Sequence, residues 1–221
     1  MIQIDVKMKI AVLGTGMVGN AIGTKLIETG HQVMMGSRTP DNIKALEWTQ
    51  SCGLNASQGT FADAAAFGEI IFNCTKGEST IEALRLAGEK HLAGKILVDL
   101  ANALDFSKGM PPSLLICNTD SLGETIQREF PGAKVVKTLN TMNCQVMVNP
   151  GLVNGEHDIF VCGNDSDAKT VVKNILTDFG WRNIIDLGDI SASRATEQLL
   201  PVWIRLMGTL GTPVFNFHVA R

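Results

Sequence analysis

The sequence predicts an α/β fold with a doubly wound, mainly parallel sheet and a small C-terminal α/β extension. Strand-like and helix-like patterns alternate along the whole 221-residue chain, which is typical of parallel sheets built from βαβ units. The expected strands are continuous apolar runs, such as residues 70–72 and 96–98, and such runs indicate strands that are covered on both faces. A glycine-rich turn follows the first run, so the pattern indicates a Rossmann-type fold.

The expected elements follow from where apolar runs and apolar residues at helical spacing fall along the chain. Apolar runs predict strands at 9–13, 32–36, 69–74, 95–100, 133–138, 158–162 and 183–187, with a weaker strand at 54–56. Helical spacing predicts helices at 18–29, 41–51, 60–66, 79–90, 121–129, 165–178 and 193–210. Met8 directly precedes the first strand, so residues 1–7 are expected to be a leader outside the fold or the product of an upstream start.

The first strand runs into the motif Gly14-Thr15-Gly16-Met17-Val18-Gly19. Gly14 permits a tight turn, Gly16 lets the backbone approach a pyrophosphate, and Gly19 lets the following helix pack close to the strand. The start of that helix offers free amides and a positive dipole end to phosphates. Because a strand pattern precedes the motif and a helix pattern follows it, the sequence predicts a dinucleotide-binding loop rather than an ordinary turn.

The end of the second expected strand bears on which dinucleotide binds. An NAD-preferring site usually places an acid there, against the ribose hydroxyls, but this chain has Ser37, Arg38 and Thr39. A guanidinium fork with flanking hydroxyls suits a dianionic phosphate, which a carboxylate would repel. These three residues are therefore expected to hold the 2′-phosphate of NADP; the alternative is a surface turn before the next helix.

Small, hydroxyl and amide side chains follow the next three strands, where ligands of doubly wound sheets lie. They suit hydrogen bonds to a ribose and a carboxamide, although each could instead cap a loop. The residues expected to bind the cofactor here are Thr75, Lys76, Ala101 and Asn102.

Composition excludes several other classes of protein. The formal net charge is −3 and the pI is about 5.8, which argues against a general nucleic-acid or membrane-surface binder. Five cysteines occur without a Cys-x-x-Cys motif or histidines at metal-ligand spacing, which indicates thiols in a reducing compartment and no metal site. No apolar stretch has the length of a signal core or of a membrane span, so a cytoplasmic protein is expected.

No acid–base residue stands out as catalytic. The chain has no tyrosine, which excludes the Tyr-x-x-x-Lys acid of short-chain dehydrogenases. His31 and His91 fall at the wrong end of the sheet, and the strand pattern puts Lys137 and Asn140 on opposite faces, against a catalytic pair. Cys144 has no histidine placed to activate it and is assigned to packing. Hydride passage between two rings needs mainly stacking at about 3–3.5 Å and exclusion of water, so this chemistry fits best.

The motifs resemble the family of coenzyme F420-dependent NADP oxidoreductases from end to end. Besides the glycine loop and residues 36–38, the resemblance rests on Val98-Asp99-Leu100-Ala101-Asn102, residues 118–124, Val136-Lys137-Thr138-Leu139-Asn140-Thr141, residues 160–165, residues 186–190 and the segment 194–201. It implies a homodimer in which NADP lies on the glycine loop and a deazaflavin stacks over the nicotinamide. By the same resemblance, Thr15, Met17 and Val18 face the pyrophosphate and nicotinamide, Thr75 and Ala101 flank the ribose and ring, and Asn140, Thr141 and Met142 line the pocket of the second substrate.

Two parts are expected along the chain. Residues 1–150 are predicted to form the NADP-binding domain and residues 151–221 a C-terminal lobe that contributes to dimerisation, with Asn149-Pro150-Gly151 as the hinge. The helix expected at 193–210 has an apolar face and is interpreted as a docking helix at a dimer contact. That face is made of Ala195, Leu199, Val202, Leu206 and Leu210. Trp203 and Phe217 are candidates for lining the acceptor pocket.

The leading hypothesis is thus an NADP(H)-dependent oxidoreductase that transfers a hydride between NADPH and a deazaflavin (coenzyme F420) or flavin-like acceptor. One alternative is a ferric-chelate reductase that works through a flavin. The other is a non-enzymatic NADP(H) sensor that acts through association with a partner.

Overall fold

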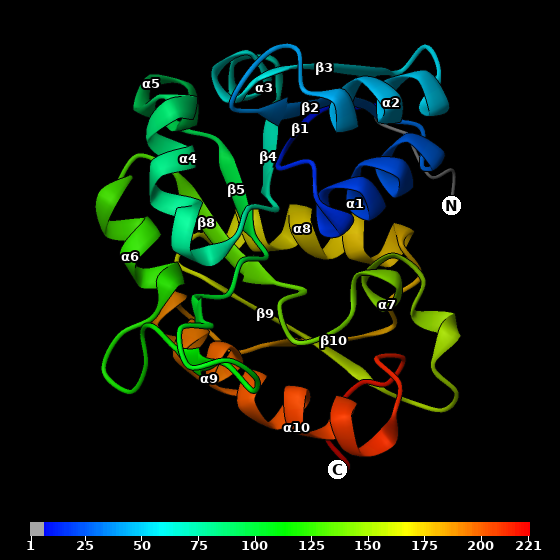
Figure 1. Cartoon of the computed structure of the whole chain (residues 1–221), viewed down its shortest axis with the longest axis vertical. Coiled ribbons are helices and arrows are strands. Elements are labelled where there is room, and N and C mark those ends of the chain that lie inside the picture. The colour runs from blue at the N-terminus through cyan, green and yellow to red at the C-terminus, as the bar shows by residue number, and fades with distance from the viewer. Residues whose placement is uncertain (1–6) are drawn as a thin grey trace.

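The computed structural model describes residues 7–221; the start of the expected leader, residues 1–6, lies outside the described part. An eight-stranded sheet runs through the molecule in the order β10-β9-β8-β5-β4-β1-β2-β3 (Figure 1). The strands are β1 Lys9–Leu13, β2 Gln32–Ser37, β3 Ala56–Thr60, β4 Ile70–Asn73, β5 Ile96–Asp99, β8 Lys134–Thr138, β9 Asp158–Gly163 and β10 Asn183–Asp186. Neighbouring strands are parallel except β8 and β9, which pair antiparallel. The predicted fold class is confirmed.

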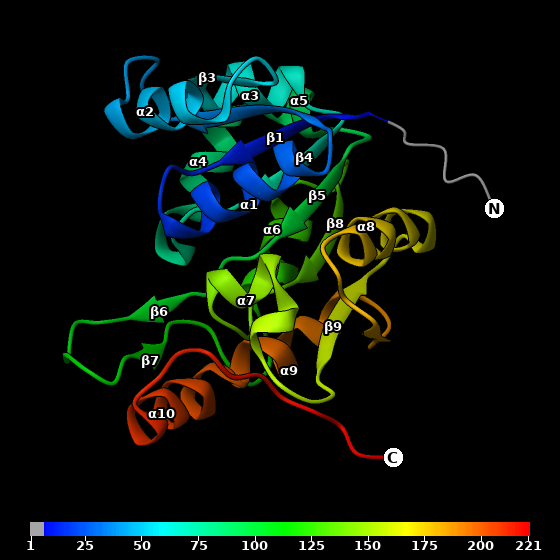
Figure 2. The same cartoon turned by 90° about the vertical axis from the view of Figure 1, so that its right-hand side faces the viewer.

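Helices cover both faces of this sheet, as Figures 1 and 2 show. One face packs against α1 Met17–Glu28, α2 Ile43–Cys52, α7 Cys144–Val148 and α8 Ser166–Asp178, and the other against α3 Phe61–Phe67, α4 Thr80–Ala87, α5 Glu89–Leu92 and α6 Leu122–Glu129. Three short 3-10 helices are η1 Gly77–Ser79, η2 Pro150–Leu152 and η3 Ile190–Ala192, and the chain continues into α9 Ser193–Gln198 and α10 Leu200–Leu210.

Alternation along the strands divides the apolar core into two layers. In β1, Ile10 and Val12 belong to the layer under α1 and α8, whereas Ala11 and Leu13 belong to the layer under α3 and α4. All four are fully buried. Side chains of a strand point alternately to its two faces, so an unbroken apolar run is needed here, and that requirement made the strands visible in the sequence.

The chain order of the strands reverses at β1, which lies between β2 and β4. In such sheets ligands bind beyond the carboxyl ends of the strands at this switch point. The loops after β1, β2, β4, β5 and β8 all open at this edge, because the six strands from β3 to β8 are parallel. The sheet continues past residue 150 without interruption, since β9 and β10 join its edge.

Two predicted helices are divided in the structure. Residues 79–90 form η1, α4 and α5, because Gly88 has a φ of 89° and turns the chain between α4 and α5. Residues 193–210 form α9 and α10, since Pro201 lacks the amide that would bond back to α9 and its ring crowds the preceding turn. The apolar residues predicted to form one face of a single helix are consequently not buried together. Ala195 is exposed, and Val202 and Leu210 are 50% and 55% exposed.

Some elements gave no usable signal in the sequence. The hairpin β6 Leu104–Asp105 and β7 Ser113–Leu114 has two-residue strands, and Figure 2 shows it projecting beside α10. α7 has five residues, too few for a helical period to register. None of the helices in the described part combines the length and apolar character needed to span a bilayer.

Candidate functional site

The glycine loop has the geometry that each of its glycines was expected to provide. Gly14 has a φ of 116°, and a Cβ there would lie 2.7 Å from the Cys74 carbonyl oxygen. A Cβ at Gly19 would lie 1.9 Å from the Gly14 carbonyl oxygen, so only glycine lets α1 pack this close. At Gly16 a Cβ would meet no atom within 4 Å, so this side of the loop is open to a ligand.

The amino end of α1 is free to receive an anion. Its N-cap residue, Gly16, offers no side-chain cap to the first-turn amides, and no acidic residue lies in that turn. Amides without an intrahelical acceptor need a partner from outside the helix. A pyrophosphate is such a partner, and it also gains from the positive end of the helix dipole.

A first cleft of about 440 Å³ opens between the glycine loop and the loop after β2. It is lined by Gly14, Thr15, Gly16, Ser37, Arg38, Asn42, Lys44, Phe61, Cys74, Thr75, Lys76, Ser79, Glu82, Ala83 and Leu86. Ser37 is buried and its Oγ donates to the Thr39 carbonyl over 2.5 Å, whereas Arg38 is exposed. Thr39 therefore supports Ser37 through its backbone and is not among the lining residues.

Several lining residues of the first cleft were absent from the sequence prediction, among them the polar residues Asn42 and Lys44. Lys44 adds a third cation to Arg38 and Lys76, and the Asn42 side chain caps α2 by accepting from the Ala45 amide. The capping pattern in the sequence could have placed Asn42 at the start of a helix, but nothing local shows that α2 lies against the glycine loop. With three cations, several hydroxyls and free helix amides, the first cleft fits the phosphates of NADP.

A second cleft of about 410 Å³ adjoins the first and shares Cys74, Thr75 and Lys76 with it. Its remaining lining residues are Val18, Gly77, Glu78, Leu100, Ala101, Asn102, Leu104, Phe106, Asn140, Met142, Met147, Leu200 and Trp203. Most of these side chains are apolar, which suits a planar ring. The hairpin residues Leu104 and Phe106 were not predicted here.

The structure brings most of the predicted binding residues to these two clefts. Met17 is 81% exposed and instead faces a groove between α1, α2 and α7, to which Trp48 and Cys144 also contribute. Thr141 is buried beside Asn140 but does not line the second cleft. Phe217 is not a lining residue either; Phe215 stacks on Trp203 with ring centroids 5.4 Å apart.

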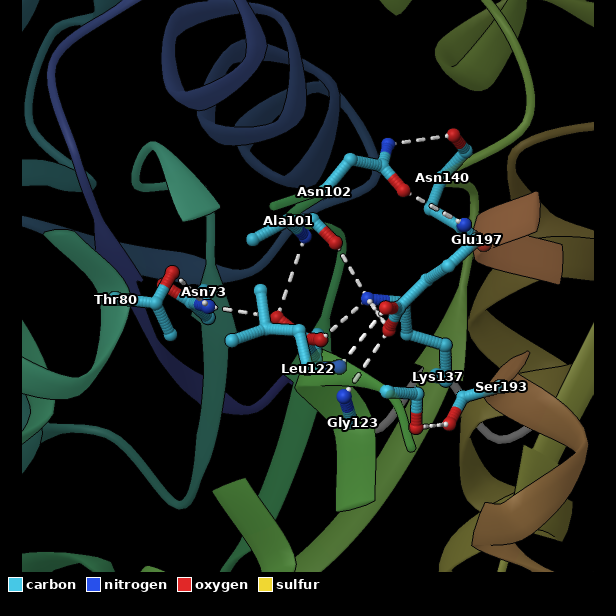
Figure 3. A network of polar contacts seen from close by, with 12 residues as sticks. Asn73, Thr80, Ala101, Asn102, Leu122, Gly123, Lys137, Asn140, Ser193 and Glu197 are labelled. Carbon is cyan, nitrogen blue, oxygen red and sulfur yellow. Dashed lines mark hydrogen bonds and ion pairs between the residues drawn. The ribbon is translucent and has the colours of Figure 1, made fainter. Parts of the chain in front are cut away.

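A buried ionic cluster around Lys137 and Glu197 (Figure 3) lies next to Ala101, which lines the second cleft. Lys137 Nζ lies 2.7 Å from Asp99 Oδ2 and 2.9 Å from Glu197 Oε1, and it donates to the Ala101 carbonyl. Burial by itself would lower the pKa of Lys137, but the two carboxylates outweigh it and raise the pKa above its ordinary value. The Lys137 ammonium is thus fully buried and held by two carboxylates and a carbonyl, and the absence of a catalytic pair with Asn140 stays a prediction.

The other titratable candidates lie away from the clefts or are held by packing. His157 packs edge-on against Trp181 and bonds the Pro150 carbonyl, and His218 lies 3.1 Å from Asp158. Burial raises the pKa of the Cys144 thiol, which makes it a poor nucleophile. Within residues 7–221, no three His, Cys, Asp or Glu side chains gather as metal ligands.

The chain is similar to proteins that share these features. Residues 9–103 match the family model "NADP oxidoreductase coenzyme F420-dependent". An F420-dependent NADP reductase of Methanocaldococcus jannaschii is 30% identical over 208 residues, which cover 90% of this chain and 92% of that protein. A crystal structure from Arthrobacter sp. FB24, assigned provisionally as an F420-dependent NADP reductase, is 54% identical, covers 97% of this chain and all of that one, and superposes with a TM-score of 0.94.

A third similarity extends to part of a longer protein. The rat Metalloreductase STEAP3 is 28% identical over 202 residues, which cover 88% of this chain. This chain corresponds to only 38% of the length of that metalloreductase.

Proposed function

Since the chain belongs to the family of coenzyme F420-dependent NADP oxidoreductases, we propose that it transfers a hydride between NADPH and a deazaflavin such as coenzyme F420 or a related flavin. Membership makes it an NADP-dependent oxidoreductase, which sets aside the non-enzymatic sensor. The observation that carries the choice of acceptor is the pair of clefts that meet at Thr75 and Lys76. One cleft offers cations and amides, and the other offers an apolar slot.

In this proposal the first cleft holds the nucleotide phosphates. The pyrophosphate lies over Gly16, where the backbone is bare, and the 2′-phosphate lies against Ser37 and Arg38, with Lys44 as a further cation. The nicotinamide end then extends along Val18 and Thr75 toward Ala101, because these residues border the second cleft. The short side chains leave space for a flat ring against the wall.

The second cleft holds the acceptor ring. Met142, Phe106 and Trp203 supply apolar surface for stacking, and Asn140 supplies a polar edge. The buried indole nitrogen of Trp203 has no hydrogen-bond partner among the described residues. A carbonyl of the acceptor ring is a suitable partner, because an unpaired buried donor is costly.

The chemistry asked of the protein is mainly positioning. NADPH supplies the hydride when it is bound, and the chain holds the two rings within about 3–3.5 Å of each other and keeps water out. The ionisable side chains that line the second cleft are Cys74, Lys76 and Glu78. Burial raises the pKa of the Cys74 thiol, so it holds its proton, whereas Lys76 and Glu78 are exposed. Any proton that the reduced ring takes up therefore comes from the solvent side of the cleft.

Steady-state oxidation of NADPH tests the proposal. Coenzyme F420, FMN and FAD are supplied separately as acceptors, with a ketone and an imine as controls that need a protein acid. Turnover with at least one ring acceptor and none with the controls is expected. Failure with every ring acceptor, in protein that binds NADPH, would overturn the proposed acceptor class.

A second candidate activity is favoured by the similarity to rat Metalloreductase STEAP3. In that case reduced flavin leaving the second cleft passes electrons to a ferric chelate. Iron reduction by the protein with NADPH is then expected only when flavin is added. Iron reduction without flavin, or none with it, contradicts this activity.

We also propose that α10 forms the contact of a homodimer. Val202 and Leu210 are half exposed on this helix, and Leu206 continues the same apolar surface. Exposed apolar stripes of this kind usually mark protein contacts. The molar mass from light scattering should be that of a dimer for the unmodified protein and that of a monomer for Leu210→Glu. A monomer for both proteins would refute this contact.

A further inference from the structure

Asp99, Lys137 and Glu197 form a chain of three charges in the interior (Figure 3). The side chains of Asp99 and Lys137 have no exposed surface, and that of Glu197 is 3% exposed. One ammonium lies between two carboxylates, so the cluster has one negative charge in excess.

The remaining partners of the two carboxylates are all donors. Asp99 Oδ1 accepts from Asn73 Nδ2 over 2.6 Å and from the Ala101 amide over 3.2 Å. The Glu197 carboxylate accepts from the first-turn amides of α6, Leu122 over 2.8 Å and Gly123 over 3.0 Å. A carboxylate surrounded by donors is in the environment of an ionised group.

No second cation balances the cluster within the part of the chain that the structure describes. The neighbouring pair across the same α6–α9 contact, Glu124 and Arg194, is balanced within itself. The amino end of α6 offsets part of the charge of Glu197. Because the cluster is shielded from water, the remaining negative potential reaches further than it would at the surface.

The cluster adjoins the wall of the second cleft. Ala101 lines that cleft, while its amide donates to Asp99 and its carbonyl accepts from Lys137. Thr75, which also lines the cleft, donates to Asn73 over 2.6 Å, and Asn73 donates to Asp99. The excess charge therefore lies one backbone layer behind the surface where the nicotinamide is proposed to rest.

We propose that Glu197 tunes the nicotinamide couple through this excess charge. The oxidised nicotinamide ring is positively charged and the reduced ring is neutral, so a negative potential behind Ala101 stabilises NADP⁺ relative to NADPH. Asp99 and Lys137 alone would be a neutral pair, and Glu197 supplies the surplus. Glu197 does not contact the nucleotide in this proposal; it acts on the nicotinamide ring only through the electrostatic potential of its carboxylate. The inference rests on the proposed function, because it needs the nicotinamide ring at Thr75 and Ala101.

The test compares the affinities for the two redox forms of the nucleotide. Glu197→Gln removes the surplus charge with little change of shape. The ratio of NADP⁺ to NADPH affinity is expected to fall about tenfold, the effect of a unit charge about 10 Å away at an effective dielectric constant of about 20. The phosphates are identical in both ligands, so their contribution cancels in the ratio. Dissociation constants come from calorimetry, and thermal unfolding confirms that each variant is folded.

Glu124→Gln is the matched control. It removes a carboxylate from the same α6–α9 contact, but Glu124 bonds Arg194 and Ser121 and does not reach Lys137. The affinity ratio of this variant should stay within about twofold of the unmodified protein. Asp99→Asn removes the surplus charge from the other end of the cluster and should reproduce the fall if Glu197→Gln does not fold.

An unchanged ratio in folded Glu197→Gln or Asp99→Asn would overturn the inference. Equal weakening of both nucleotides would also overturn it, because that is the result of a purely structural role. These outcomes differ from failure of the proposed function, in which the unmodified protein transfers hydride to no ring acceptor.

Discussion

Asn102 and Asn140, which both line the second cleft, are joined by two reciprocal hydrogen bonds. Asn102 Nδ2 donates to the Asn140 carbonyl over 2.8 Å, and Asn140 Nδ2 donates to Asn102 Oδ1 over 3.0 Å. The two residues come from the loops after β5 and β8, which are neighbouring strands of the sheet. Leu139 precedes Asn140 with a φ of 62°, an uncommon conformation for a side chain of this kind. The reciprocal bonds therefore fix a loop that would otherwise be free to relax.

Asn140→Ala should weaken use of the acceptor more than binding of the nucleotide. The change removes one of the two bonds and leaves Asn102 Oδ1 without its donor, so the edge of the second cleft loses its fixed position. A loss of about tenfold in kcat/KM for the ring acceptor is expected, with the NADPH dissociation constant within about threefold. Stopped-flow transfer and NADPH titration measure the two quantities; equal losses in both would count against this division of the site.

The glycines of the loop should respond in opposite ways to alanine. Gly19→Ala brings a Cβ to 1.9 Å from a backbone oxygen, so α1 must move away from the strand. A destabilisation of about 2–3 kcal/mol or more is expected. Gly16→Ala meets no atom within 4 Å and should leave stability within about 0.5 kcal/mol, while the methyl group obstructs the pyrophosphate. Urea unfolding and NADPH titration of both variants check this prediction. A Gly19→Ala variant as stable as the unmodified protein would contradict it.

Arg38→Ala should remove the preference for the phosphorylated nucleotide. Arg38 is exposed and lines the first cleft beside Ser37 and Lys44. Loss of a charge-assisted contact of about 1.5–3 kcal/mol corresponds to about 10- to 150-fold weaker NADPH binding. NADH, which lacks the 2′-phosphate, serves as the control ligand and should bind with unchanged affinity. A parallel loss for NADH would mean that Arg38 contacts the adenine and not the phosphate.

Asp186 should contribute to stability in a defined pH window. Burial would raise its pKa, but Lys173, Lys169 and the Gly188 amide lower it to about 2. Because the pKa in the folded state lies below its ordinary value of 3.8, the stabilisation is present above about pH 4 and is lost as the pH falls toward 2. The side chain is 32% exposed, so a contribution of about 1 kcal/mol is expected after solvent screening.

Acid unfolding of Asp186→Asn should accordingly be less steep between pH 4 and 2, and the protein less stable at pH 7. Asp41→Asn, at an exposed position before α2, is the control and should unfold like the unmodified protein. An unchanged acid limb in Asp186→Asn would show that the lysine contacts contribute nothing to stability.

The sequence was sufficient where the structure depends on local pattern. The strong apolar runs, the helices α1, α2 and α8 and the glycine loop carry their own periodicity or turn chemistry, and they lie close to where they were predicted. The weak strand expected at 54–56 instead forms as β3, Ala56–Thr60, whose sequence is mostly polar and small. The reversal of β9 could not be predicted, because antiparallel pairing to β8 depends on which edge of the sheet is free. The break at Pro201 could have been predicted from the proline rule, but the apolar spacing on either side concealed it.

The residues of the candidate site also fall into those that local sequence pattern predicts and those that depend on tertiary contacts. Ser37, Arg38 and Thr75 follow strands and could be placed at the ligand edge by that fact alone. Lys44 and Phe106 could not, since their contribution depends on how α2 and the short hairpin fold back over the clefts. The pairing of Lys137 with Glu197 joins residues 60 positions apart, and neither carries a local signal of burial, because charged residues are normally exposed.

The ionic cluster also links the two sides of the predicted division near residue 150. Glu197 follows the predicted division near residue 150, yet its carboxylate accepts hydrogen bonds from the first amides of α6 and pairs with the ammonium of Lys137 in β8. A fragment ending at residue 150 would leave those amides uncapped and Lys137 with one carboxylate fewer. We therefore expect that engineered hybrids keep these contacts only when α6, β8 and α9 are exchanged together.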